Sequence, residues 1–217
     1  MEEPTMTLRA RAYENFTARL LAREIQPGQF VSQRELVEIT GMPLGAIREM
    51  IPRLEADGLI RTVPHRGLQI AHVDLDLIRN AFQLRLLLER EAVAHYARVA
   101  PAERVLAMRA EHLAVRAEAE GGVTADLLER AQHLDWQMHD VMVDALGNAL
   151  ISDIYRVNSI KIRLIRQEDT RMLPELVVSV MDEHLTILAA LAAGDAEAAV
   201  AAMTAHIESA RRRALRL

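Results

Sequence analysis

Four side chains in the second half of the sequence could together hold a metal ion. Asp135 and His139 are four residues apart, a spacing that places both on one face of a helix. His184 and His206 each fall within a later stretch of apolar residues at helical spacing. One carboxylate and three imidazoles form a complete ligand set for a divalent cation such as zinc, nickel or manganese, with positions left for water or a small anion. The spacing of the two later histidines does not by itself require that they converge on the first pair.

Other histidines give weaker signals. His95, His112 and His133 match no motif, and we expect them at the surface or in packing contacts. The adjacent pair His139 and Asp140 permits an enzymatic alternative, because HD-type phosphohydrolases hold metal through such a pair and use a metal-bound water as the nucleophile. The further histidine and aspartate that this chemistry needs cannot be placed in the sequence.

Long amphipathic helices are predicted to carry these residues. From Asp74 onward the sequence has apolar residues at helical spacing, glycine and proline between the segments, and no strand pattern. The predicted helices span residues 74–98, 102–119, 124–146, 148–168, 173–193 and 195–215. We therefore predict an all-α antiparallel helical bundle over residues 74–217.

The first 73 residues have a different pattern. Ser32 and Glu35 form a capping box, which predicts the start of a short helix between two longer ones. The predicted elements are helices over residues 7–25, 32–40 and 43–57, and strands over residues 59–63 and 68–71. This order is typical of a winged helix-turn-helix, in which the third helix enters the major groove of DNA and the hairpin reaches the flanking backbone. The fold class is therefore mainly α, with a winged helix-turn-helix domain over residues 1–73.

Composition and charge limit the function classes. The 217-residue chain has no cysteine, which excludes disulfides and thiolate chemistry, and no apolar run long enough to span a membrane. The N-terminal segment MEEPTMTLRARAYENF has no apolar core of a signal peptide, so we expect a cytoplasmic protein. Residues 1–73 contain nine arginines, no lysine and nine acidic residues, so net charge does not indicate nucleic-acid binding. Attraction to DNA must therefore come from individual arginines.

Residues 27–73 resemble the DNA-binding domain of the GntR family. The resemblance is carried by the order of G, RELVE, IRE, RLEADGLI and the RG of the predicted wing. In that family an arginine of the short helix, an arginine of the recognition helix and a wing glycine approach DNA, and the wing tip offers two further candidates. The residues implied to contact DNA here are Arg34, Arg48, His65, Arg66 and Gly67. The planar guanidinium can bind guanine or a phosphate through two hydrogen bonds.

Two departures from that family pattern affect the recognition helix. Leu44 stands where the family has an arginine that reads a base, and leucine cannot donate a hydrogen bond. Pro52 lies inside the helix and removes the bond to the carbonyl of Arg48, which costs about 3 kcal/mol unless a bend absorbs it. We therefore expect an unusual operator and a bend that redirects the N-terminal half of the helix toward the groove.

Residues 74–217 resemble the FCD ligand-binding domain of the FadR-type GntR regulators, and six helices are typical of the VanR-like subgroup. The segments LDWQMHDVMVDALGNALI and MDEHLTILAALAAGDAEAAVAAMTAHI carry the resemblance. In many such domains an aspartate and three histidines at these places bind a metal that helps to hold a small carboxylate. The resemblance thus implies a metal site formed by Asp135, His139, His184 and His206. Arg85 and Arg163 are the candidate cations for the carboxylate effector.

These patterns together predict a homodimeric transcription regulator, a repressor, that binds double-stranded operator DNA. Metal and a small organic acid would bind in the bundle and change the affinity for the operator. One alternative is the HD-type phosphohydrolase. The other is a winged-helix module that binds only partner proteins, which the zero net charge of residues 1–73 favours.

Overall fold

The contacts of the chain divide it into two compact units in the computed structural model, which describes residues 6–169 and 173–215. One unit comprises Met1–Leu77 with Ile160–Gln167, and the other comprises Ile78–Ser159 with Glu168–Leu217. Helix α7 (Ala149–Asp169) therefore contributes residues to both units.

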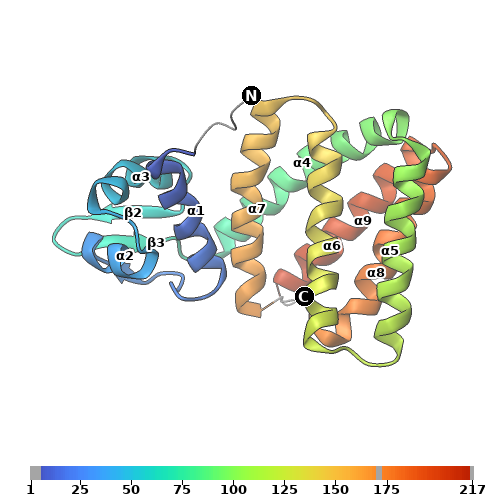
Figure 1. The fold of residues 1–217 in the computed structure, drawn as a ribbon. Helices are drawn as coiled ribbons and strands as arrows, with labels where there is room; N and C mark the ends of the chain where they lie inside the picture. The colour runs from blue at the N-terminus through green and yellow to red at the C-terminus, as the bar shows by residue number, and fades with distance from the viewer. Residues whose placement is uncertain (1–5, 170–172, 216–217) are drawn as a thin grey trace. The chain divides into compact units, whose positions relative to one another are not determined.

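The first unit has the element order of a winged helix-turn-helix (Figure 1). Its elements are α1 (Leu8–Leu21), β1 (Phe30–Val31), α2 (Gln33–Thr40), α3 (Leu44–Ala56), β2 (Ile60–Val63) and β3 (Gly67–Ile70). The strands form an antiparallel sheet in the order β1-β3-β2, so the predicted hairpin is extended by a strand that the sequence pattern did not predict. Phe30 and Val31 alone form that strand, and two residues are too few to show an alternating pattern.

Local sequence signals explain where the helices of this unit begin and end. The hydroxyl of Ser32 accepts a hydrogen bond from the backbone of Glu35, whose carboxylate accepts one from the backbone of Ser32, so the predicted capping box is confirmed. Gly41 ends α2 in the left-handed conformation. Helix α3 is α-helical from Leu44 through Pro52 to Ala56. The bend that we expect at Pro52 stays a prediction.

Apolar residues of all three helices and of the sheet form the core of the first unit. Phe16 and Leu20 of α1 and Ile47 and Leu54 of α3 are fully buried. Leu164, from the part of α7 that belongs to this unit, is buried in the same cluster. Burial of each such side chain stabilises the fold by roughly 1.5–3 kcal/mol. This core fixes the orientation of α3 relative to the wing.

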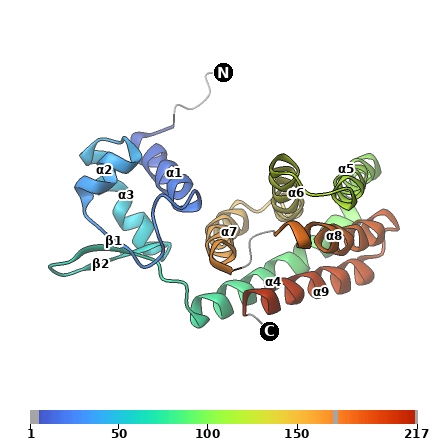
Figure 2. The same cartoon turned by 90° about the horizontal axis from the view of Figure 1, so that it is seen from below.

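The second unit is an all-α bundle. Its helices are α4 (Leu75–Val99, from Ile78), α5 (Ala102–Glu120), α6 (Ala125–Asp144), α7 up to Ser159, the 3-10 helix η1 (Pro174–Leu176), α8 (Val177–Ala192) and α9 (Ala196–Ala214). Helix α8 packs on both α5 and α9, and α6 packs on α5 and α8 (Figure 2). The predicted fold class, a winged helix-turn-helix followed by a helical bundle, is confirmed. Within the described residues, no helix is long and apolar enough to cross a membrane.

Candidate metal centre

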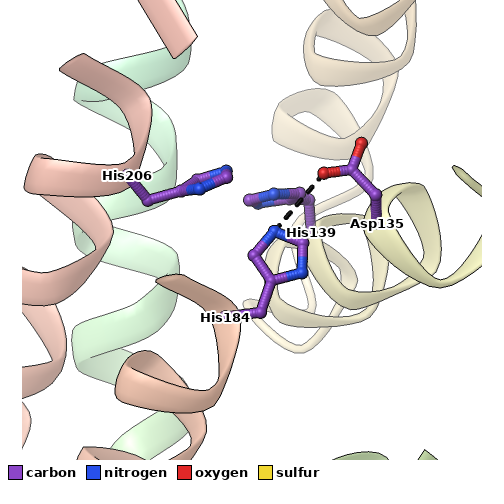
Figure 3. A group of neighbouring side chains, drawn as sticks. All are labelled: Asp135, His139, His184 and His206. Carbon is purple, nitrogen blue, oxygen red and sulfur yellow. Dashed lines mark ion pairs between the residues drawn. The ribbon is translucent and has the colours of Figure 1, made fainter. Parts of the chain in front are cut away.

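Asp135 and His139 of α6, His184 of α8 and His206 of α9 converge in the interior of the bundle (Figure 3). One potential ligand atom from each residue lies within 4.8 Å of those of the others. All four side chains are buried, none more than 3% exposed. The structure thus brings together the four residues that the sequence patterns selected, and does so in the part of the bundle where water is excluded.

The histidine rings of the cluster pack directly on one another. The centroids of His139 and His206 are 5.1 Å apart in a stacked arrangement, and those of His184 and His206 are 4.7 Å apart. Burial lowers the pKa of His206 to about 4 and lowers the pKa of His184 well below its ordinary value. Both rings are therefore neutral at physiological pH, the form in which an imidazole can ligate a metal.

Two of the histidines have a glutamate behind the ring. Nδ1 of His206 donates a hydrogen bond to Oε2 of Glu183 at 2.7 Å, and Nδ1 of His139 lies 2.7 Å from Oε2 of Glu89. Such a carboxylate holds the proton on Nδ1 and leaves the lone pair of Nε2 for the cluster. Burial raises the pKa of Glu183, but hydrogen bonds from His206 and Arg213 outweigh burial and hold it at about 2.

The donor atoms of this cluster fit a divalent cation. Nε2 of His206 is buried and has no hydrogen-bond partner among the described residues. Nε2 of His184 is 3.3 Å from Oδ1 of Asp135, a long contact for two groups at the centre of a protein. A buried polar atom without a partner costs about 1–3 kcal/mol. A cation bound among these atoms would satisfy them together, and three nitrogens with one oxygen suit zinc, nickel or manganese.

Arg85 of α4 is buried beside the cluster and is 4% exposed. Its Nε donates a hydrogen bond to Oε1 of Glu89 at 2.7 Å, and the hydroxyl of Tyr155 donates to the same oxygen at 3.0 Å. Burial by itself would lower the pKa of Arg85 and raise the pKa of Glu89. The attraction between the two opposite charges outweighs burial, so the pKa of Arg85 lies above its ordinary value and the pKa of Glu89 lies below its own. Nη2 of Arg85 donates to Nε2 of His139 at 2.9 Å. The predicted effector cation therefore touches a predicted metal ligand.

Arg163, the second candidate cation for the effector, and Asp140, on which the phosphohydrolase alternative depends, are not members of the group of four metal-compatible residues. Arg163 is half-buried on α7, in the segment that belongs to the first unit, and its effector role stays a prediction. Asp140 is not in the metal-compatible group found among the described residues, although His139 is. The adjacent pair on which the phosphohydrolase alternative depends is therefore not part of this cluster.

His112 of α5 was not selected by the sequence patterns as a site residue. It is 1% exposed, and its ring centroid is 5.3 Å from that of His184. Burial lowers the pKa of His112. The available signal was its position on the same helix face as the apolar Val105 and Val115, which also are buried. The expectation of a surface or packing role did not foresee that it lies against the cluster.

Two arginines predicted to contact DNA are exposed on the helices of the first unit. Arg34 lies on α2 and Arg48 on α3. Nε of Arg48 donates a hydrogen bond to Oε1 of Gln33 at 3.2 Å, which links the two helices. Leu44, the first residue of α3, is 37% exposed. An apolar side chain thus stands at the end of the helix that reads the groove in winged helix-turn-helix proteins.

The wing tip contains a strained turn. The amide of Arg66 donates to the carbonyl of Val63, and His65 has a φ of 61°, a conformation that L residues other than glycine rarely adopt. The guanidinium of Arg66 lies 4.0 Å from the centroid of the Phe30 ring. Gly67 has a φ of 92°, and a Cβ there would lie 3.0 Å from the carbonyl oxygen of Val31. The fold itself therefore requires glycine at this position, whether or not it approaches DNA.

Comparison with known proteins agrees with this architecture. The family model of the FCD domain matches residues 80–209. The chain is 28% identical over 202 residues to the HTH-type transcriptional regulator LutR of Bacillus subtilis, covering 85% of this chain and 90% of LutR. It is 22% identical over 194 residues to the probable HTH-type transcriptional regulator LgoR of Escherichia coli, covering 89% of this chain and 64% of LgoR. The chain therefore spans just under two thirds of the length of LgoR.

The fold also matches a solved structure along nearly its whole length. A protein described as a GntR transcriptional regulator from Rhodococcus sp. RHA1 has a TM-score of 0.73 and 20% sequence identity, and the match covers 95% of this chain and 97% of that one. At this identity the likeness concerns the fold.

Proposed function

Because this chain belongs to the family of proteins with an FCD domain, we propose that it is a GntR-type transcription regulator whose bundle controls its DNA binding. In this proposal it is a repressor of the FadR type, with the six-helix bundle of the VanR-like subgroup. Its bundle binds a divalent metal and a small carboxylate, and occupancy changes the affinity for operator DNA. The observation that carries the proposal is the buried group of one carboxylate and three imidazoles in the family-matched domain.

The DNA-binding half of the proposal has two independent supports. Both curated relatives are named as HTH-type transcriptional regulators. In the first unit, Arg34, Arg48 and Arg66 are exposed on the helices and wing that face DNA in this architecture. Because residues 1–73 contain equal numbers of basic and acidic residues, specific arginine contacts must supply the attraction that net charge does not.

In the proposed metal site, Asp135, His139, His184 and His206 are the ligands. Bound there, a divalent cation would supply positive charge and open coordination positions for a carboxylate. The charged groups connected to the site by direct contacts are Asp135, the two glutamates behind its histidines (Glu89 and Glu183) and the arginines bonded to those glutamates (Arg85 and Arg213). Their formal charges sum to one negative charge, so a divalent cation leaves one positive charge. That balance favours an anion over a neutral ligand.

Arg85 connects the metal site to the proposed effector site. It donates to Nε2 of His139, the nitrogen whose lone pair faces away from Glu89. A lone pair given to a metal cannot also accept this hydrogen bond. Metal loading therefore releases one N–H of Arg85, which a carboxylate of the effector can accept. Glu89 would keep the arginine at the site through the bond to Nε.

A homodimer is proposed because two winged helix-turn-helix domains bind a two-fold symmetric operator more tightly than one domain does. Leu150 is 74% exposed and Ile154 is 51% exposed, and their spacing places them on one face of α7. Apolar side chains this exposed at adjacent turns are typical of a surface that a second copy covers.

The test is operator binding by the full-length chain, measured as fluorescence anisotropy of labelled DNA from upstream of its own gene. The protein is stripped with a chelator and then titrated with zinc and a set of small carboxylates. We expect His184→Ala to abolish the response to zinc and carboxylate while DNA binding persists, and His133→Ala, an exposed histidine of α6, to respond as wild type. A normal response from His184→Ala would refute the metal site. Absence of DNA binding at low salt in every state would favour the protein-interaction alternative.

A further inference from the structure

The three clustered histidines differ in what lies behind their outward ring nitrogens. Behind His139 and His206, a glutamate oxygen lies 2.7 Å from Nδ1 in each case. Nε2 of His184 faces the cluster, 3.3 Å from Asp135, so its Nδ1 faces outward. That Nδ1 is buried and has no hydrogen-bond partner within the described part of the chain. A metal-ligating histidine almost always donates its other N–H, so His184 lacks the acceptor that the other two have.

His112 offers a nitrogen of the complementary kind. Its Nδ1 donates to the carbonyl of Met108 at 2.7 Å, and a carbonyl only accepts, so the proton of the neutral ring is on Nδ1. Its Nε2 therefore carries a lone pair, and that atom too is buried without a hydrogen-bond partner in the described residues. The rings of His112 and His184 are neighbours, edge to face with 5.3 Å between their centroids, and no hydrogen bond joins the two described side chains in this structure.

We propose that His112 is a positioning residue of the loaded metal centre, whose Nε2 accepts a hydrogen bond from Nδ1 of His184 once Nε2 of that ring binds a cation. The inference rests on the proposed metal site. The bond fixes the tautomer of His184 that offers the lone pair of Nε2 to the cation, as Glu89 and Glu183 do for the other two histidines. The backbone of α5 fixes His112 in turn, through the carbonyl of Met108.

The use of an imidazole in place of a third carboxylate has an electrostatic consequence. Glu89 and Glu183 each bring a negative charge next to the site, whereas a neutral imidazole accepts the same hydrogen bond without one. A glutamate at residue 112 would cancel the positive charge that the loaded site keeps for an anion. In the loaded site, loss of the acceptor leaves a buried N–H unpaired or favours the tautomer of His184 that cannot bind metal through Nε2. Loss of such an outer partner weakens metal binding by about 10- to 100-fold.

A cavity beside His112 makes the proposal testable by chemical rescue. The cavity has a volume of about 180 Å³ between α5 and α6, and its walls include His112 and Met138. It shares Glu111, Leu134 and Gln137 with a wider groove of about 560 Å³ on the same face of the bundle. Removal of the ring of residue 112 therefore leaves a space that free imidazole can reach.

The experiment measures the zinc affinity of the full-length chain by competition with a chromophoric chelator. His112→Leu fills the space without an acceptor, and His112→Gln places an amide oxygen close to the position of Nε2. We expect His112→Leu and His112→Ala to bind zinc at least about tenfold more weakly than wild type, and His112→Gln to remain within about threefold. Millimolar imidazole should return His112→Ala toward wild type, with wild type at the same imidazole concentration as reference. His133→Leu, on the outer groove, is the matched control.

Two further measurements separate the proposal from a purely structural role. The free energy of unfolding in chelator should differ little between His112→Leu and wild type, because leucine fills the site. Nitrogen-15 NMR of the zinc-loaded protein should show the Nδ1–H of His184 in a hydrogen bond in wild type and without one in His112→Leu. Equal zinc affinity of His112→Leu and wild type overturns the inference about His112 alone. Failure of wild type to bind zinc overturns the metal site and this inference together.

Discussion

Acidification of the metal-free protein tests the burial of His206 quantitatively. Burial lowers the pKa of this residue from 6.5 to about 4 in the folded chain. Below pH 6.5 the unfolded chain takes up a proton that the folded chain refuses, so the free energy of unfolding falls until the pH reaches about 4. The difference between these two pKa values corresponds to about 3 kcal/mol of lost stability. His184 is buried in the same way, so it should add to the loss with the same sign.

The single tryptophan of the chain allows this loss to be measured in the bundle. Trp136 directly follows Asp135 on α6, so its fluorescence reports the unfolding of the second unit. Urea denaturation is followed in chelator at several pH values between neutral and about 4. Zinc at about 100 times its dissociation constant should add about 2.7 kcal/mol at neutral pH.

The variant His206→Asn isolates the contribution. The amide nitrogen of asparagine can take the place of Nδ1 and donate to Glu183, but the side chain does not titrate. We expect the variant to lose about 3 kcal/mol less than wild type over the same pH range. His133→Asn, exposed on α6, is the control and should follow wild type. If His206→Asn and wild type show the same pH dependence, His206 is not held neutral by burial, and the proposed ligand geometry is wrong.

Three further predictions concern other parts of the chain. His65→Gly should raise the free energy of unfolding of the first unit by about 1 kcal/mol, because glycine adopts the φ of 61° without strain. A lower midpoint of thermal unfolding than that of wild type would contradict this. Arg48→Ala should weaken operator binding. If the arginine contacts a phosphate, the slope of log affinity against log salt concentration should also become smaller in magnitude by about one. Unchanged operator affinity would show that Arg48 does not contact DNA. Leu150→Glu combined with Ile154→Glu should yield monomers in sedimentation experiments, and a persistent dimer would exclude this face of α7.

The helices of the bundle were predictable because each one is both amphipathic and bounded by a residue that ends helices. The segment predicted over residues 102–119 is α5, Ala102–Glu120, and the one predicted over 195–215 contains α9, Ala196–Ala214. Strand β1 was not predicted, because its two residues gain their hydrogen bonds from β3, almost forty residues later. Likewise, only the packed structure shows that Ile160–Gln167 belong with the first unit.

The candidate site was predictable to a different degree at each residue. Asp135 and His139 are a local pair, so helix geometry alone places them together. The convergence of His184 and His206 depends on how α8 and α9 pack, and the family resemblance supplied it. Glu89 and Glu183 could not be identified from the sequence as outer partners, because each lies on a different helix from the histidine that it contacts.

Arg85 sits where a change in the metal site can be passed along the chain. Helix α4 begins at Leu75, a few residues after the wing strand, and continues without a break to Val99. Arg85 and Glu89 lie on this helix, and the hydrogen bond from Arg85 to His139 ends when that nitrogen binds a metal. A loaded site thus requires a new partner for a buried cation on the same helix that leads back to the wing. A ligand shifts an equilibrium between two states only by the difference in its affinity for them. An effector carboxylate that accepts a hydrogen bond from the released N–H therefore stabilises the state in which Arg85 no longer donates to His139. Metal and effector should therefore bind cooperatively, and Arg85 should be the residue through which each raises the affinity for the other.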